Sequence, residues 1–330
     1  MKYLKLFENF QDIDFLCEEY GIGNYTINDE GTVDVDGDVA LYSRRLESLP
    51  IKFGKVGGNF DCVGNKLTSL KGCPEEVGGN FNCSINKLTS LEGCPQNIDG
   101  KFDCSNNKLK SLLGGPTEVG GNFSCFNNLL TSLKGSPKEV GGLFRFSFNR
   151  LKSLEGCPKD VGGDFWCCYN LLSSLEGCIK EIGGGFYCYY NKITSLKGCP
   201  DKVDGDFSCY NNKLKSLEGG PKEVFGIFNC NNNKLTSLKG CPDKVGGGFF
   251  CHHNKLTIID YLPLKISGSI DLSYGKIKDI RVERKSYFFG GKCSLYKNPI
   301  DEEFEKWNGN LSGFIKNLNR LRRINEILIP

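Results

Sequence analysis

Alanine and methionine are almost missing from this sequence, occurring only as Ala40 and Met1. Alanine is the strongest helix former, and glycine, asparagine, phenylalanine and β-branched residues stand in its place, so a mostly helical fold is excluded. Long apolar runs are also missing, and charges interrupt the apolar residues of the opening MKYLKLFENFQDIDFLCEEY. The sequence therefore predicts neither a membrane span nor a signal peptide, and we expect a cytoplasmic, reducing compartment.

Charge of one sign is not in excess, because 42 lysine and arginine residues face 39 aspartate and glutamate residues. No strong net field therefore draws the chain to nucleic acid or anionic lipid. The sequence contains no C-x-x-C pair, no zinc-type His and Cys spacing, no phosphate-binding loop and no hydrolase motif. We therefore expect no metal, no cofactor and no catalytic residues.

A repeat of 21 residues runs through most of the chain. Each unit reads V-x-G-x-F-x-C-x-x-N-x-L-x-x-L-x-G-x-P, and the asparagine recurs without a miss from Asn65 to Asn254. The phenylalanine keeps the same step at Phe60, Phe81, Phe102, Phe123, Phe144, Phe165, Phe186, Phe207, Phe228 and Phe249. A fixed period of this length is the signature of a solenoid.

Each recurring residue suggests a role in a coil of that solenoid. The alternation of Val77, Gly79, Phe81 and Cys83 predicts a short strand with one inward face, and stacked coils then form a parallel sheet. Asn86 follows the strand, where a buried amide can bond turn backbone groups in its own and neighbouring coils. The next two leucines are expected in the interior, and the glycine and proline turn the chain back.

The string F-x-C-x-x-N-x-L-x-x-L resembles the leucine-rich-repeat signature L-x-L-x-x-N-x-L, with phenylalanine and cysteine replacing two leucines. The 21-residue unit is similar to the short bacterial class, and the repeat together with the opening MKYLKLFENF resembles leucine-rich-repeat-like proteins of tailed bacteriophages. The resemblance covers about residues 35–300. It implies a solenoid with a parallel β-sheet on its concave face, little helix in the repeats and a binding role whose partner the fold does not specify.

Three segments are expected along the chain. Residues 1–34 are predicted to form an N-terminal cap, with an amphipathic helix over 3–20 and a hairpin around Asn28 to Gly31. Residues 35–300 form the solenoid of about twelve to thirteen coils. Residues 301–330 form a C-terminal cap with short helix, whose apolar residues from Leu311 to Leu328 have helical spacing and are expected to cover the open end of the core.

Cysteine occurs in two ladders. Nine cysteines take the inward strand position: Cys62, Cys83, Cys104, Cys125, Cys167, Cys188, Cys209, Cys230 and Cys251. Six take a turn position that glycine or serine fills in other coils: Cys73, Cys94, Cys157, Cys178, Cys199 and Cys241. Because buried cysteine behaves as a small hydrophobe, we interpret both ladders as free structural thiols rather than disulfides or metal ligands.

Two charged patterns have structural interpretations. Asp34, Asp36 and Asp38 resemble a calcium loop, but the required glycine and twelfth-position carboxylate are missing, so we expect exposed aspartates on an edge strand. Lysine or arginine follows the repeat asparagine in eight of ten coils. This column is interpreted as a solubility feature, with phosphate binding as the alternative.

The outward strand positions differ between the early and late coils. The early coils place small polar residues there, and from the fourth coil on aromatic residues, two histidines and one arginine appear. We predict that these later residues form a concave aromatic face that binds a protein partner, since exposed aromatics with an arginine are typical of interfaces. Stabilisation of the sheet by cross-strand stacking is the alternative. The candidate residues are Phe126, Arg145, Phe148, Trp166, Tyr169, Tyr187, Tyr189, Tyr190, Tyr210, Phe250, His252 and His253.

The sequence therefore favours a non-catalytic protein-binding module over an enzyme. A structural or virion-associated phage protein is one alternative, which would place the chain in the host cytoplasm or the virion. Single-stranded nucleic-acid binding along the rim lysines and the tyrosines is another, and a less favoured one. A second copy of the chain covering the aromatic residues, as a homo-oligomer, is also open. His252 and His253 have no nearby nucleophile motif and are assigned to the margin of the binding face.

Overall fold

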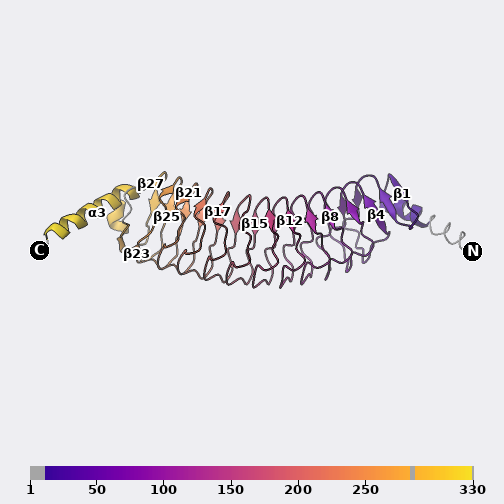
Figure 1. The fold of residues 1–330 in the computed structure, drawn as a ribbon, viewed down its shortest axis with the longest axis horizontal. Coiled ribbons are helices and arrows are strands. Elements are labelled where there is room, and N and C mark those ends of the chain that lie inside the picture. Colours follow the sequence, from indigo (N-terminus) through magenta and orange to yellow (C-terminus); the bar gives the residue numbers. More distant parts are fainter. Residues whose placement is uncertain (1–11, 283–286, 329–330) are drawn as a thin grey trace, which may run out of the picture. The chain divides into compact units, whose positions relative to one another are not determined.

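The structure is a computed structural model that describes residues 12–282 and 287–328. The chain divides into two compact units, unit 1 (Met1–Gly163) and unit 2 (Asp164–Pro330). Both are built from parallel-strand solenoid coils. Together they contain about twelve turns with little helix, as the sequence predicts. Figure 1 shows the coils of each unit stacked side by side.

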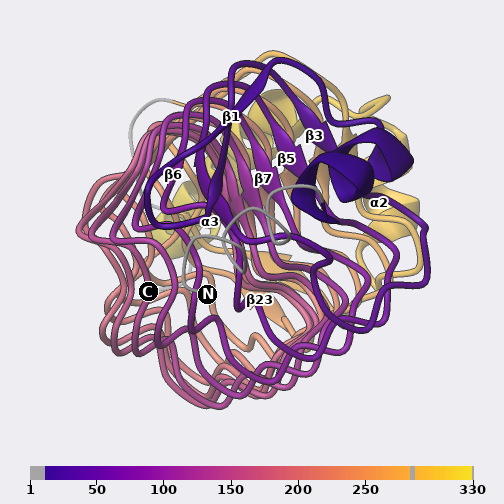
Figure 2. The same cartoon turned by 90° about the vertical axis from the view of Figure 1, so that its right-hand side faces the viewer.

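Unit 1 carries two sheets on different sides of its coils, and both are parallel except for the antiparallel pair of β1 (Tyr25–Ile27) and β2 (Val33–Val35). The main sheet pairs six strands in register, namely β3 (Val39–Ala40), β5 (Phe60–Asp61), β7 (Phe81–Asn82), β9 (Phe102–Asp103), β11 (Phe123–Ser124) and β13 (Phe144–Arg145). The second sheet contains β1, β2, β4 (Phe53–Val56), β6 (Glu76–Val77), β8 (Asn97–Ile98), β10 (Glu118–Val119), β12 (Glu139–Val140) and β14 (Asp160–Val161). Figure 2 shows β3, β5 and β7 in one row, with β6 apart from them.

Unit 2 repeats this arrangement. Its main sheet contains β15 (Phe165–Trp166), β16 (Phe186–Tyr187), β18 (Phe207–Ser208), β20 (Phe228–Asn229), β22 (Phe249–Phe250), β25 (Ile270–Asp271) and β28 (Cys293–Ser294). Its second sheet contains β17 (Lys202–Val203), β19 (Glu223–Val224), β21 (Lys244–Val245), β24 (Lys265–Ile266) and β27 (Phe288–Phe289), and a short pair joins β23 (Ile258–Ile259) to β26 (Asp279–Ile280).

The single inward strand predicted for each coil is in fact two short strands. In the coil of Val77, that residue ends β6 and Phe81 begins β7, with a glycine pair between them. At such glycine pairs neighbouring coils approach closely. For example, a Cβ atom at Gly141 would overlap the carbonyl oxygen of Gly120 in the preceding coil. The glycine pair therefore bends the chain, and one continuous alternation becomes two sheets.

A ladder of buried phenylalanines forms the centre of each core. Phe81 lies 5.7 Å from Phe102 and Phe102 lies 5.1 Å from Phe123, measured between ring centroids. In unit 2, Phe207 stacks between Phe186 at 5.5 Å and Phe228 at 5.3 Å, and all these rings are fully buried. In-register stacking therefore fills the core with one ring per coil.

Replacing one ring of this ladder should be costly. We expect Phe207→Ala to lower the free energy of unfolding of unit 2 by about 3–5 kcal/mol, because the cavity cannot close between two fixed neighbouring coils. Urea denaturation measures this loss. Phe225→Ala is the matched control, because Phe225 is 55% exposed and its truncation should cost far less. Equal losses for the two variants would contradict the ladder's structural role.

The repeat asparagine bonds across coils as predicted. Asn233 accepts the Leu214 N–H through Oδ1 at 3.0 Å and donates through Nδ2 to the carbonyls of Cys209 and Cys230, both at 3.1 Å. The same pattern recurs at other repeat asparagines, for example Asn128. Each amide thus satisfies backbone groups of its own coil and of the preceding one.

The cysteines of the inward ladder are all buried, and all 18 cysteines are free thiols. In the turn ladder Cys73, Cys94 and Cys199 are buried, whereas Cys157, Cys178 and Cys241 are half-buried. Burial raises the pKa of Cys83 and Cys188 well above the usual value for a thiol. The thiols therefore act as small core residues in their neutral form.

The N-terminal end contains a helix and a hairpin. Residues 12–20 are helical, while residues 3–11 of the predicted helix lie outside the described part. Strands β1 and β2 pair antiparallel around the expected turn at Asn28 to Gly31. The edge position predicted for the aspartates is wrong, because β2 also pairs with β4, and Asp34 accepts the Lys55 N–H at 2.7 Å. Its carboxylate thus caps the next coil.

The C-terminal end contains α2 (Asp301–Glu305) and α3 (Leu311–Leu328). Leu311, Phe314 and Ile315 of α3 are buried and Leu321 is exposed, while the side chains of residues 323–328, part of the predicted apolar set, lie outside the described part. Among the described helices, none combines the length and apolarity needed to cross a membrane.

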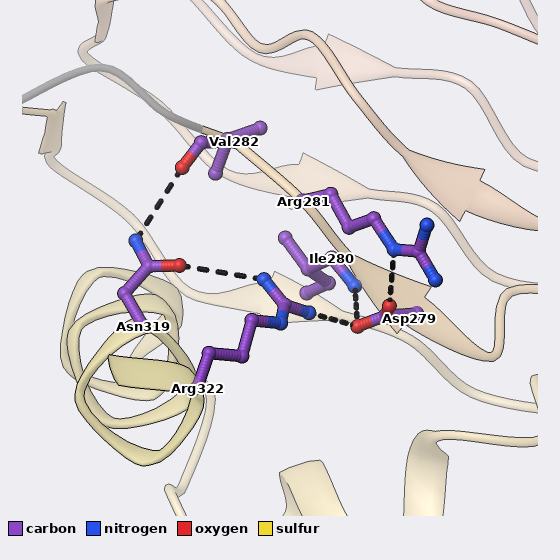
Figure 3. A network of polar contacts seen from close by, with 6 residues as sticks. All are labelled: Asp279, Ile280, Arg281, Val282, Asn319 and Arg322. Carbon is purple, nitrogen blue, oxygen red and sulfur yellow. Dashed lines mark hydrogen bonds and ion pairs between the residues drawn. The ribbon is translucent and has the colours of Figure 1, made fainter. Parts of the chain in front are cut away.

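A polar network links the middle of α3 to residues 279–282, which begin with β26 (Figure 3). Arg322 forms an ion pair with Asp279, which also accepts a hydrogen bond from Arg281 at 2.7 Å. Asn319 donates to the Val282 carbonyl at 3.4 Å. These contacts join the middle of α3 to the coil segment beside it.

Candidate functional site

The outer surface of the unit 2 main sheet carries three rows of side chains. The first row follows the ladder phenylalanine, the second follows the inward cysteine, and the third is the next residue along. Six aromatic residues occupy these rows in neighbouring coils, and each is partly or fully exposed to solvent. We call this set the aromatic face: Trp166, Tyr169, Tyr187, Tyr189, Tyr190 and Tyr210.

Rings of the aromatic face stack in pairs between neighbouring coils. In-register pairing places Trp166 beside Tyr187, with ring centroids 4.0 Å apart and an interplanar angle of 22°. The other two stacked pairs are Tyr189 with Tyr210 at 4.4 Å and Tyr169 with Tyr190 at 4.5 Å, each at 12°. Tyr189 also contacts Tyr169 and Tyr190 edge to face. The second and third rows therefore form one continuous cluster.

The outer edge of the Tyr187 ring lies over Gly185 of its own strand, where a larger residue would leave no room for it. A Cβ atom at Gly185 would come within 2.7 Å of the Tyr187 hydroxyl oxygen. Burial raises the pKa of Tyr187 to about 12, and the nearby carboxylates of Asp164 and Asp206 add to the shift. Trp166 donates from Nε1 to the Asp164 carboxylate at 3.3 Å. The phenol is therefore neutral at physiological pH.

The third row holds the backbone in the left-handed region in every repeat coil. Gly64, Asn106 and Asn127 have φ values of 70°, 55° and 52° there, and glycine and asparagine tolerate this conformation. Tyr169 and Tyr190 adopt φ values of 54° and 51° in the same row. For a bulky side chain this conformation costs about 1–2 kcal/mol. Local backbone preference therefore opposes tyrosine in this row.

The backbone strain of a bulky residue in the third row can be measured in unit 1. Ile85 occupies this row with φ 54° and is 55% exposed. We expect Ile85→Asn to raise the free energy of unfolding by about 1 kcal/mol. The Asn127 amide already donates to the Asn106 Oδ1 at 2.8 Å, so a further amide extends an existing ladder. Urea denaturation checks the gain, with Ile85→Val as a control that keeps the strain. An asparagine variant no more stable than wild type would rule out the strain.

The remaining predicted residues are described within each unit. In unit 1, the Arg145 guanidinium lies 4.2 Å from the centre of the Phe126 ring, which contacts Phe148 edge to face at 5.1 Å. Arg145 and Phe148 are exposed and Phe126 is half-buried. An arginine stacked on one of two contacting aromatic rings has the composition of an interface anchor.

The histidines of unit 2 join an aromatic neighbour that the sequence interpretation missed. His252 contacts His253 edge to face at 5.0 Å, and His253 stacks on Tyr274 at 4.5 Å. Burial lowers the pKa of His252, whose Nδ1 has no hydrogen-bond partner among the described residues. Phe250 is half-buried and lies over Gly248 as Tyr187 does over Gly185. Tyr274 was missed because its coil has glycine in place of the repeat asparagine.

The small polar residues of the early coils have a structural role that the sequence did not reveal. The Asn59 Oδ1 accepts the Asn80 N–H at 2.8 Å, and the Asn80 Oδ1 accepts the Lys101 N–H at 2.7 Å, so each caps the next coil. Their outer surface forms a trough of about 460 Å³ that also includes Asp61 and Asp103. Among the described residues, no group of three or more His, Cys, Asp or Glu side chains is arranged to hold a metal ion.

Parallel coils of about 21 residues define a leucine-rich-repeat solenoid. The fold is similar to that of YopM from Yersinia enterocolitica WA-314, with a TM-score of 0.58 and 19% sequence identity. The alignment covers 81% of this chain and 58% of that chain, so this chain matches little more than half of that YopM.

A second similar structure is YopM of Yersinia pestis, described as a leucine-rich effector protein, with a TM-score of 0.38 and 16% identity over 79% of this chain and 83% of that chain. No protein-family model and no curated protein matches the sequence. The comparison therefore establishes the leucine-rich-repeat fold and leaves the function to the site.

Proposed function

We propose that this chain is a non-catalytic protein-binding module and that the aromatic face of unit 2 is its contact surface. The observation that carries the proposal is the position of Tyr169 and Tyr190 in the left-handed third row. Asparagine fills the same row at Asn211 and Asn232 without that steric cost. Tyrosine is therefore placed where local backbone preference opposes it, as is usual for residues kept for function.

Sheet stabilisation is a weaker explanation for these rings. Stacked pairs contribute about 0.5–1.5 kcal/mol each, which offsets the backbone strain without clearly exceeding it. Stabilisation alone also gives no reason to cluster aromatic residues in the coils of Trp166 to Tyr210 while the outer rows of the first coils carry Asp61, Asn82 and Asp103. Exposed clustered tyrosine and tryptophan are instead the residues that dominate protein interfaces.

The charge of the face favours protein over nucleic acid as the partner. No lysine or arginine occupies the three outer rows or the position before the ladder phenylalanine in the coils from Asp164 to Asn211. That preceding position holds the carboxylates of Asp164 and Asp206. A phosphate backbone binds through cations, and here it would meet carboxylates beside the rings.

A pull-down from lysate of the source cells, with mass spectrometry, tests this function. The comparison is between wild type and a Trp166, Tyr187 and Tyr189 triple-alanine variant whose folding is checked by circular dichroism. A second variant carries alanine at Phe225, Tyr261 and Phe288, which are exposed aromatics outside the three outer rows in the same unit. We expect a protein retained by wild type and by the second variant but lost from the first. Retention by all three forms would show that the aromatic face is not the binding surface.

A further inference from the structure

Two carboxylates flank Tyr187 on the aromatic face. The Asp164 Oδ1 accepts the Gly185 N–H at 2.7 Å, and the Tyr187 ring lies over that same glycine. On the other side, the Asp206 main-chain carbonyl accepts the Phe186 N–H at 2.7 Å, which places Asp206 in the adjacent coil beside the ring. Both carboxylates contribute, after burial, to the raised pKa of Tyr187. The phenol ring therefore sits between two negative charges.

Neither carboxylate forms an ion pair with a lysine or arginine among the described residues. Their polar contacts are to neutral donors, such as the Ile227 N–H at 2.7 Å from the Asp206 Oδ1. Elsewhere in unit 2, carboxylates are commonly paired, as Asp204 is with Lys202 at 2.8 Å. The negative charge beside Tyr187 is thus left without a cation.

The ring stack of the first row ends at Tyr187. In-register pairing places Trp166 on one side of Tyr187 and Ser208 on the other. No ring therefore follows Tyr187 in the direction of Ser208. Asp206 belongs to the coil of Ser208. The Tyr187 end of this ring stack, next to a carboxylate without an ion-pair partner, suits a flat cation, because the face of an aromatic ring attracts positive charge.

We propose that Asp164, Tyr187 and Asp206 form a binding site for an arginine side chain of the protein partner. This inference rests on the proposed function and specifies which partner side chain contacts the aromatic face. A guanidinium is planar, stacks on aromatic rings and donates in a fork to carboxylates. A lysine ammonium has the same charge but cannot stack, so arginine fits both features of the site.

Intrinsic tryptophan fluorescence provides the readout. The chain has two tryptophans, and full-length protein carrying Trp307→Phe leaves Trp166, which stacks on Tyr187, as the sole reporter. The probes are Gly-Arg, Gly-Lys and Gly-Gln repeat peptides of equal length, titrated at low and high salt. Asp164→Asn with Asp206→Asn removes both charges and keeps the backbone bonds, since Asn59 and Asn80 make the same bond in other coils. Glu181→Gln with Glu303→Gln is the charge-matched control on exposed carboxylates of the same unit.

We expect the Gly-Arg peptide to bind at least about tenfold more tightly than the Gly-Gln peptide, a difference of about 1.4 kcal/mol. The double Asp→Asn variant should lose most of this preference, and the Glu→Gln control should keep it. Equal affinity for Gly-Arg and Gly-Lys would overturn the assignment of arginine, and an unchanged preference in the Asp→Asn variant would overturn the site. If the captured partner depends on the aromatic face but not on the two aspartates, the proposed function stands and this inference fails.

Discussion

Raising the pH from about 8 to about 10 is expected to destabilise unit 1 strongly, through its buried thiols. Burial raises the pKa of these thiols in the folded chain, whereas the unfolded chain ionises them near their ordinary value of about 8.5. Above that pH the unfolded state binds fewer protons than the folded state, so stability falls by about 1.4 kcal/mol per thiol and pH unit. Unit 1 has eight such thiols: Cys17, Cys62, Cys73, Cys83, Cys94, Cys104, Cys125 and Cys157.

Urea denaturation across this pH range, under reducing conditions, measures the slope. Lysines and tyrosines also titrate at high pH, so the informative quantity is the difference between wild type and a Cys83→Ala, Cys104→Ala variant. That variant should show a slope shallower by about 2.8 kcal/mol per pH unit, because two fewer protons are released on unfolding. Identical slopes would mean that these thiols are not held neutral by burial.

The second large effect concerns the repeat asparagine. Asn107 accepts the Leu88 N–H at 2.9 Å and donates to the carbonyls of Cys83 and Cys104, both at 3.1 Å. We expect Asn107→Ala to lower the free energy of unfolding of unit 1 by about 3–5 kcal/mol, since several buried backbone groups lose their partner at once.

Urea denaturation provides this measurement as well, and Asn97→Ala is the matched control. Asn97 is exposed on β8, so the same chemical change there should alter stability by no more than about 0.5 kcal/mol. If Asn107→Ala lowered the free energy of unfolding by only as much as Asn97→Ala, water would be replacing the Asn107 amide. The repeat asparagines would then not be essential for stability.

Most of the fold is predictable from the 21-residue period of the sequence. Phe81, Cys83 and Asn86 recur at fixed positions, so one coil's pattern predicts the inward face, the buried thiols and the asparagine bonds of all coils. The two-sheet arrangement was not predictable from alternation alone. It depends on how closely Gly120 and Gly141 approach between coils, which is a property of stacked coils rather than of one strand.

The aromatic face was predictable for a related reason. Once the inward residues are assigned, Trp166 and Tyr187 must point outward, and the structure places both on the outer surface. The left-handed conformation of Tyr190 and the positions of Asp164 and Asp206 beside Tyr187 were not predictable. Both depend on backbone geometry and on register between coils, which sequence spacing does not reveal.

Inward and outward residues of a coil have different roles. Inward residues such as Phe207 and Asn233 repeat closely and give stability. Outer residues vary, and Tyr169 and Tyr190 are kept at a backbone cost. A solenoid with many stabilising coils tolerates such local strain, since the core of neighbouring coils offsets it.

The most direct test of the binding face is the affinity of the captured partner, measured by titration calorimetry with purified proteins. We predict that the Trp166, Tyr187 and Tyr189 triple-alanine variant binds at least about 100-fold more weakly than wild type, as expected when central aromatic anchors are removed. The Phe225, Tyr261 and Phe288 variant should bind within about threefold of wild type. An unchanged dissociation constant for the first variant, or an equal loss for the second, would contradict the assignment of the aromatic face as the contact surface.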